Sequence, residues 1–346
     1  AIEKAMASKQ KSRVPAKSKD ETEIEIEDSY KDIRDLTSVG VNSADIDKLK
    51  NAGIHSIGTL FQRPMKALTD VKGLTEAKVF KILDAAKKLD NKNELNLFIT
   101  GLEAKERRKN IIRITTGAKS LDAILGGGIE TGSITEFYGE FRTGKTQLMH
   151  TLAVTTQVER DQGGGAGKVV YIDTENNFRP ARCSAIAERF GLDPDSVLEN
   201  IITCTPESHE QQMDSVVAVG ALCIENGPIR LLIIDSIISL FRTDFCGRGE
   251  LSERQQKLNQ HLVSLKNLSK EFNLAVVIVN QVMSDPSGMN SFGPTLKPVG
   301  GHVLSHASTT RVMLKKGRGE ERIAKLCDSP LMPEADAHFL ISDAGI

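Results

Sequence analysis

Apolar and polar residues follow two different patterns along this chain of 346 residues. Between residues 36 and 89, apolar residues recur with helical spacing on either side of glycine turns, as in segments 43–60 and 65–89. From Ile111 onward, short apolar runs alternate with helical periods instead. The change of pattern predicts a small helical domain followed by a larger α/β domain.

Three apolar runs in the second region are typical of strands that are buried on both faces. They are 169–173 (VVYID), 231–235 (LLIID) and 275–280 (AVVIVN), and each ends in polar residues. Helical segments lie between them, which predicts a parallel sheet with its ligand at the carboxyl ends of the strands. Another short strand is predicted over 133–138 (SITEFY), with a helix over 147–157.

Two other segments lack regular periodicity. Residues 1–28 are first basic and then acidic, with few large apolar side chains, which predicts a disordered charged tail. Residues 90–110 are polar and charged around an apolar island at Phe98, which can dock on another surface or fold back onto its own domain. The predicted organisation is a tail over 1–28, a helical domain over 29–89, a linker over 90–110 and an α/β core over 111–346.

Composition narrows the possible partners. The formal net charge is -1, so any contact with nucleic acid must come from local basic patches and not from the field of the whole protein. Tryptophan is absent, and the five cysteines lack C-x-x-C spacing, which favours a reduced intracellular compartment over disulfides or zinc. No apolar run approaches the ~20 residues of a membrane span, so we expect a soluble protein without a membrane partner.

Residues 139–147 (GEFRTGKTQ) have the G-x-x-x-x-G-K-T spacing of a phosphate-binding loop. Backbone N–H groups of such a loop surround phosphate oxygens, the Lys145 ammonium reaches the outer phosphates, and the Thr146 hydroxyl coordinates Mg²⁺. The predicted strand before the loop and the helix after it supply the order that the motif requires, whereas an ordinary glycine turn is the alternative. The predicted phosphate site comprises Gly139, Glu140, Phe141, Arg142, Thr143, Gly144, Lys145, Thr146 and Gln147.

Polar residues at the ends of three predicted strands complete a candidate catalytic site. Asp235 follows four apolar residues, as a Walker B aspartate does, and is predicted to hold Mg²⁺ directly or through water. Glu175 can polarise a water in line with the γ-phosphate, and an amide at Asn280 or Gln281 can sense that phosphate. Each carboxylate alone could be a helix cap, but three such strand ends beside one phosphate loop favour catalysis.

Three segments are candidates for DNA contacts. Residues 241–256 place Arg242 and Arg248 in one glycine-containing loop, and residues 282–298 form a long predicted loop without periodicity. Arginines on such loops suit a phosphodiester backbone, although a plain strand-to-helix turn is the alternative. Gly73 lies at the turn of a predicted helix-hairpin-helix, which can offer N–H groups to DNA or can simply be a solvated turn.

With these motifs in order, the chain resembles the eukaryotic RecA-like DNA strand-exchange recombinases from about residue 36 to its end. The resemblance rests on the phosphate loop, residues 114–136, "YIDTEN", "LLIIDSI", "GRGELSERQQKL", "GGHVLSHASTTR" and "KGRGEERIAK", and is closest to the meiosis-specific branch. It implies a RecA-like P-loop ATPase core with a central, mostly parallel sheet, plus a small all-α helix-hairpin-helix domain. The implied function is ATP-dependent pairing and strand exchange by a filament on single-stranded DNA; a general-repair recombinase or a non-exchanging filament scaffold are the alternatives.

The resemblance also implies the roles of individual residues. With ATP and Mg²⁺ as cofactors, Glu175 positions the attacking water, and Lys145, Thr146 and Asp235 hold the phosphates and the metal. Arg182 lies on the adenine, Gln281 couples the γ-phosphate to the second DNA loop, and His306 acts on the nucleotide of a neighbouring protomer. The implied DNA contacts are Arg242, Gly247, Arg248, Val282, Pro286, Lys72 and Gly73.

The implied partners are single-stranded DNA, homologous duplex DNA, further copies of the chain in rings or filaments, and recombination mediator proteins, all in the nucleus.

Two departures from the family pattern stand out. The Phe-x-x-Ala motif that hooks the next protomer ends in Gly101 here, which removes about one CH₂ of burial, ~0.8 kcal/mol, and predicts weaker association. Residues 293–296 (GPTL) lack the acidic residue that relatives place over the neighbour's nucleotide.

Overall fold

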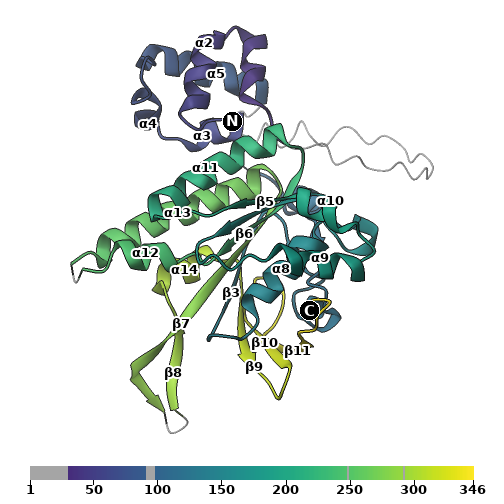
Figure 1. Ribbon diagram of the computed structural model, residues 1–346. Coiled ribbons are helices and arrows are strands. Elements are labelled where there is room, and N and C mark those ends of the chain that lie inside the picture. The colour runs from purple at the N-terminus through teal and green to yellow at the C-terminus, as the bar shows by residue number, and fades with distance from the viewer. Residues whose placement is uncertain (1–29, 91–97, 248, 291–292) are drawn as a thin grey trace.

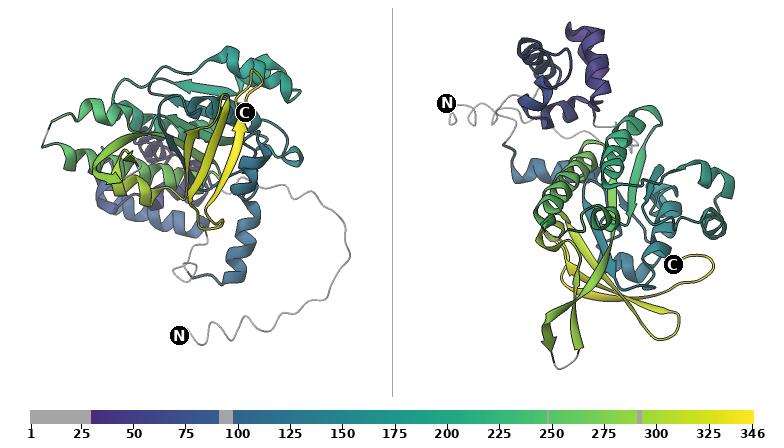
Figure 2. Two further views of the ribbon diagram at one scale, coloured as in Figure 1. Left: turned by 90° about the horizontal axis from the view of Figure 1, so that it is seen from below. Right: turned by 60° about the vertical axis from the view of Figure 1, so that its left-hand side comes forward.

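The computed structural model describes residues 30–90, 98–247, 249–290 and 293–346, with only the backbone given for 284–290 and 293–296. The predicted tail and Arg248 lie outside the described residues. Within them, a small helical domain lies above an α/β core, and the two views of Figure 2 show it against one end of that core. None of the helices in these ranges has the length and apolar character that a membrane span requires.

The N-terminal domain is entirely helical in its described part. Polar residues start its helices: the Asn42 side chain accepts a hydrogen bond from Ala44 N–H, and Ser56 accepts one from Thr59 N–H. Its own core is buried around Leu36, Leu49 and Leu60. The elements are η1 (Ile33–Val39), α2 (Ser43–Asn51), α3 (Ile57–Gln62), α4 (Met65–Thr69) and α5 (Glu76–Asp90).

The α/β core is built on a nine-stranded sheet in the order β11-β10-β9-β3-β7-β6-β4-β5, with β8 paired to β7. The six strands from β9 to β5 are parallel, and β10 and β11 add an antiparallel edge. The mostly parallel sheet that the apolar runs predict is therefore confirmed. The strands are β3 (Ile134–Gly139), β4 (Lys168–Asp173), β5 (Ile201–Cys204), β6 (Ile229–Asp235), β7 (Ala275–Asn290), β8 (Gly293–Pro298), β9 (Thr310–Lys316), β10 (Glu321–Asp328) and β11 (Ala335–Leu340).

Helices cover both faces of this sheet, because alternate residues of each central strand point to opposite sides. In β6, Leu231 and Ile233 belong to one apolar core, while Leu232 and Ile234 belong to the other. On the first face lie α7 (Lys119–Ile124), α8 (Lys145–Thr155), α9 (Pro180–Arg189) and α10 (Pro194–Glu199). On the second lie α11 (His209–Glu225), α12 (Ser239–Asp244), α13 (Leu251–Glu271) and α14 (Gly301–Ala307).

The helical domain contacts the middle of α11 and the C-terminal end of α13. The rings of Tyr30 and Phe272 lie 5.0 Å apart. A side chain at Gly53 would meet Val217, and one at Gly58 would meet the Glu271 carboxylate, so both glycines permit close approach of the two domains.

Two predicted loops have more structure than the sequence indicated. Residues 282–290 and 293–298 form an antiparallel hairpin of β7 and β8, which extends away from the core (Figure 1), so the prediction of a structureless loop was wrong. Strand β7 continues beyond the main sheet and offers its backbone to β8. The sequence of this segment has neither a helical nor a strand period, so the pairing could not be predicted from it. Arg242 lies on α12 and not in a loop, and only residues 245–250 connect α12 with α13.

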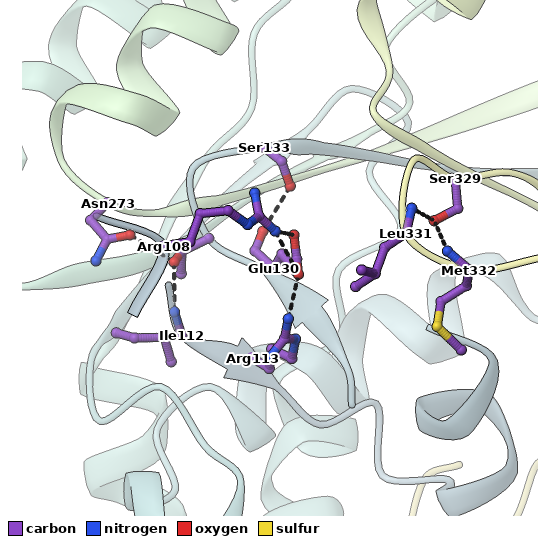
Figure 3. A network of polar contacts seen from close by, with 10 residues as sticks. Arg108, Ile112, Arg113, Glu130, Ser133, Asn273, Ser329, Leu331 and Met332 are labelled. Atoms are coloured by element: carbon purple, nitrogen blue, oxygen red, sulfur yellow. Dashed lines mark hydrogen bonds and ion pairs between the residues drawn. The ribbon is translucent and has the colours of Figure 1, made fainter. Parts of the chain in front are cut away.

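The described part of the linker region is attached to the α/β core at its C-terminal end. Its helix α6 (Gly101–Arg107) begins with a capping box between Thr100 and Glu103 and continues into η3 (Arg108–Asn110). Figure 3 shows Arg108 beside Glu130 of β2 (Ile129–Glu130), which pairs with β1 (Arg113–Ile114). The Asn273 side chain also donates to the Asn110 carbonyl oxygen at 2.8 Å.

Candidate nucleotide site and DNA-facing elements

The phosphate-binding loop lies between β3 and α8, as its motif predicted. Gly144 has a φ of 97°, a left-handed conformation that favours glycine, and a side chain at Gly139 would collide with the Leu314 carbonyl. The loop borders a cavity of about 960 Å³. All nine residues predicted for the phosphate site, Gly139 to Gln147, line this cavity, together with Glu175, Arg182, Asp235 and Gln281.

Charged groups of the loop and of β6 meet at the floor of the cavity. Lys145 Nζ donates to the carbonyl oxygens of Gly139 and Glu140 at 2.9 and 2.7 Å, and burial lowers the pKa of its ammonium. Asp235 Oδ2 accepts hydrogen bonds from the hydroxyls of Thr146 at 2.8 Å and Tyr171 at 3.2 Å. Burial raises the pKa of Asp235 to about 6, so a cation beside this carboxylate would stabilise its charged form.

The oxygen atoms of Thr146 and Asp235 fit Mg²⁺. This ion prefers hard oxygen donors and is commonly held by one or two carboxylates plus substrate phosphates. Within the described ranges no group of three or more histidine, cysteine or acidic side chains has the arrangement of a metal site. An ion held together with bound phosphate would therefore suit the pair Thr146–Asp235.

A line of hydrogen bonds leads from the predicted catalytic carboxylate to α12. Glu175 Oε1 accepts from Ser236 Oγ at 2.8 Å and from Gln281 Nε2 at 2.9 Å. Gln281 Oε1 in turn accepts from Arg242 Nη1 at 3.4 Å. The predicted catalytic carboxylate and an arginine of a predicted DNA-binding segment are thus connected through the Gln281 amide.

Arg182 lies at the opposite end of the cavity, on α9. Its Nε donates to Gln147 Oε1 at 2.8 Å, and its two terminal nitrogens donate to the carbonyl oxygens of Ser342 and Asp343. The sequence analysis missed the segment from Ile341 to Asp343, which lines the cavity although it is about 160 residues away in the sequence. No local motif marks this segment, since only the fold brings it to the phosphate loop.

The other predicted DNA contacts lie on three separate elements. Gly247 N–H donates to Glu250 Oε2 at 2.7 Å, which makes a tight turn between α12 and α13. Val282 follows Gln281 at the base of the hairpin, and Pro286 lies at the irregular part of its ladder. Asp244, the last residue of α12, accepts hydrogen bonds from both the backbone N–H and the ring of His209, which fixes the end of that helix.

In the helical domain, Lys72 and Gly73 occupy the turn before α5. Both are exposed, and Gly73 has a φ of 87°. Lys48 Nζ donates to the Gly73 carbonyl oxygen at 3.2 Å and to Asp45 Oδ1 at 2.6 Å, so the turn is held by a charge pair.

The residues predicted to contact another protomer are distant from the cavity of their own chain. His306 lies on α14, beside α13, with its ring 6.1 Å from that of His302. Phe98 is 86% exposed, and Leu102, four residues later, is 69% exposed. Gly101 is the first residue of α6. The fold-back alternative for Phe98 is therefore wrong in the isolated chain.

Comparison with known proteins places this site in a family. The sequence profile of the Rad51 family matches residues 107–346. The chain belongs to the Rad51 family. This match covers the whole α/β core, including the phosphate loop and every strand of the nine-stranded sheet.

Individual relatives extend the match to the helical domain. The chain is 51% identical over 326 residues to the meiotic recombination protein DMC1 homolog of Lilium longiflorum, covering 94% of this chain and 92% of that protein. It is 50% identical over 316 residues to the meiotic recombination protein DMC1 of Saccharomyces cerevisiae, covering 91% and 93%. It is also 51% identical over 323 residues to the meiotic recombination protein DLH1 of Candida albicans, covering 93% and 98%. The resemblance inferred from the motifs is confirmed for this Rad51-family chain.

Proposed function

We propose that this Rad51-family protein is a DNA-dependent ATPase that pairs homologous DNA molecules and exchanges their strands during meiotic recombination. The observation that carries the proposal is identity of about 50% to meiotic recombination proteins along more than nine-tenths of the chain. The connected line Glu175, Gln281 and Arg242 supports it, because it joins a hydrolytic carboxylate to a DNA-facing arginine.

On the nucleotide side, each residue of the cavity has a distinct task. The backbone of the loop and Lys145 bind the phosphates of ATP, and Arg182 holds the adenine end. Glu175 orients a water molecule and accepts its proton. Thr146 and Asp235 would hold Mg²⁺, which would supply positive charge beside the phosphate oxygens. Gln281 exchanges its hydrogen bond with Glu175 for one to the γ-phosphate, and so reports whether ATP is intact.

On the DNA side, the segments after β6 and β7 bind single-stranded DNA. Arg242 contacts the backbone from α12 and Arg248 contacts it from the connection between α12 and α13, where Gly247 lets the chain approach closely. Val282 and Pro286 act from the hairpin. Lys72 and Gly73, in the helical domain of residues 29–89, offer a cation and N–H groups to the phosphates of duplex DNA. None of these contacts requires a particular base sequence, as homologous pairing demands.

Self-association completes the proposed activity. The linker of residues 90–110 presents Phe98 and the start of α6 to solvent, while Arg108 fixes its other end to the core. Strand β5 ends the sheet, so its outer edge is open to another backbone within the described structure. A second copy of the chain therefore docks its Phe98 beside β5, and His306 reaches the neighbouring nucleotide. The result is a filament in the nucleus, to which recombination mediator proteins give access to DNA.

The test is strand exchange between a fluorescent single strand and a homologous duplex, run with ATP, a non-hydrolysable analogue, ADP and no nucleotide. We expect exchange with the first two only, because bound triphosphate stabilises the active filament. DNA binding without exchange in every arm would refute the recombinase and favour a regulatory scaffold. Staining of meiotic nuclei with a specific antibody tests the site of action, and a signal confined to non-dividing somatic cells would contradict the meiotic role.

A further inference from the structure

Asn280 and Gln281 are neighbours at the end of the part of β7 that lies in the main sheet, yet they face different surroundings. Gln281 lines the nucleotide cavity, whereas the side chain of Asn280 is fully buried on the other side of the strand. Asn280 touches neither the phosphate loop nor the cavity-lining carboxylates in any described contact. Any role of Asn280 must therefore come from the segments to which its side chain is hydrogen-bonded.

The Asn280 amide uses all of its hydrogen-bonding groups on three different segments. Its Nδ2 donates to Glu136 Oε1 and to the Val299 carbonyl oxygen, both at 2.8 Å, and its Oδ1 accepts from the Gln281 N–H at 2.8 Å. Val299 directly follows β8, and its own N–H donates to the Gln281 carbonyl oxygen at 2.9 Å. Both legs of the DNA-facing hairpin are therefore joined at Gln281 by one side chain.

Glu136 gives this amide a fixed support. It lies on β3, three residues before the phosphate loop begins, and is completely buried. Arg311 of β9 neutralises it, with Nε 2.7 Å from Oε2, and the Arg311 guanidinium also lies 5.3 Å from the centre of the Tyr138 ring. A buried charge that is paired and hydrogen-bonded in this way is held in one geometry, because any displacement leaves a polar group unsatisfied.

We propose that Asn280 is a positioning residue that transmits the nucleotide state to the hairpin. The Glu136–Arg311 pair fixes Asn280 to the strand that carries the phosphate loop, and Asn280 ties Gln281 to Val299. When Gln281 moves toward a γ-phosphate, the hairpin base moves with it as one rigid unit. Without Asn280, Gln281 still reaches the phosphate, but the second leg of the hairpin no longer follows.

This inference rests on the proposed function and is tested by the coupling between nucleotide and DNA. We would measure the affinity for a fluorescent oligothymidine with a non-hydrolysable ATP analogue and again with ADP. The coupling ratio is the first affinity divided by the second. Couplings of about 5- to 150-fold are typical for linked sites. For Asn280→Ala we expect a ratio close to one, with the affinity for a labelled ATP analogue unchanged within about threefold and DNA stimulation of hydrolysis lost.

Thr131→Ala is the matched control. Thr131 is also buried, and its hydroxyl likewise takes part in two hydrogen bonds: it accepts from Ile112 N–H and donates to Asn273 Oδ1. Those bonds lie at the opposite end of β3 from Gln281. We expect this variant to lose thermal stability, as Asn280→Ala does, but to keep the wild-type ratio.

If Asn280→Ala fails to fold, Asn280→Ser keeps a polar group at this position, but its hydroxyl has a single donor and cannot bond Glu136 and Val299 together. It should also show a reduced ratio. A wild-type ratio in either Asn280 variant, or an equal loss in the Thr131 control, would overturn the inference. A wild-type protein whose ratio is already one would instead overturn the proposed function, so the two failures are distinguishable.

Discussion

Replacing Gly101 by alanine should strengthen self-association, because it restores the side chain that the hook motif of relatives carries. Gly101 is the first residue of α6, its φ lies outside the left-handed region, and a β-carbon built there meets nothing within 4 Å. The substitution therefore introduces no clash within the protomer. Alanine also has less backbone freedom than glycine, so less conformational entropy is lost when α6 forms.

Two effects determine the size of the gain. Glycine in a helix costs roughly 0.5–1 kcal/mol relative to alanine. Burial of the added methyl group against the next protomer contributes about 0.8 kcal/mol. Their sum is about 1.5 kcal/mol, which corresponds to roughly tenfold tighter association at each junction.

Sedimentation velocity over a range of protein concentrations, without DNA, measures this directly. Gly101→Ala should assemble at about one-tenth of the wild-type concentration. Phe98→Ala should abolish assembly, and the double variant should behave like Phe98→Ala, since the methyl group has no anchor without the ring. A Gly101→Ala protein that assembles at the wild-type concentration or above would refute the docking of this segment on a second copy.

Three further variants test the site and the helical domain. Lys145→Ala should lose binding of a fluorescent ATP analogue and with it nucleotide-dependent filaments, and filaments that still respond to ATP would contradict the phosphate site. Asp235→Asn should raise the thermal stability of the nucleotide-free protein at pH 8 by the equivalent of about 3 kcal/mol, because burial raises the pKa of Asp235 to about 6 and the folded state must hold a charge there. Since the folded carboxylate binds its proton below about pH 6, the difference in melting temperature should shrink toward pH 4, and a constant difference would be inconsistent with that cause. Asp45→Asn should destabilise the helical domain at pH 7, because hydrogen bonds from Lys48 and Lys78 lower the pKa of Asp45 and stabilise its charged form. That stabilisation is lost as the pH falls through the folded pKa of Asp45. Circular dichroism should therefore show equal stability of variant and wild type in strong acid.

Motifs with a local physical cause were readable from the sequence. The phosphate loop has its glycines, lysine and threonine at a fixed spacing within one short segment, and the central strands are continuous apolar runs because both faces are covered. Glu175, Asp235 and Gln281 could then be identified by their positions at the ends of those strands. Roles at other protomers and on DNA came from the family resemblance instead.

Features that depend on the fold were not readable. The two strands of the β7–β8 hairpin pair with each other beyond the main sheet, and the sequence of this segment shows no regular alternation of apolar and polar residues. The segment of Ile341 to Asp343 reaches the nucleotide cavity only because β9, β10 and β11 extend the sheet past the phosphate loop. The buried pair Glu136–Arg311 joins strands 175 residues apart, and a single acidic residue in an apolar strand gives no sign of its partner.

We propose that bound ATP, and not its cleavage, drives strand exchange. This is tested by strand exchange with the Glu175→Gln protein in the presence of ATP, with phosphate release measured in the same reaction. Loss of the carboxylate that orients the water should slow hydrolysis by about 10²- to 10⁴-fold, whereas Gln281 remains free to meet the γ-phosphate. We expect strand exchange to continue while hydrolysis nearly stops. If exchange stops together with hydrolysis in a variant that still binds ATP and single-stranded DNA, then hydrolysis itself drives exchange.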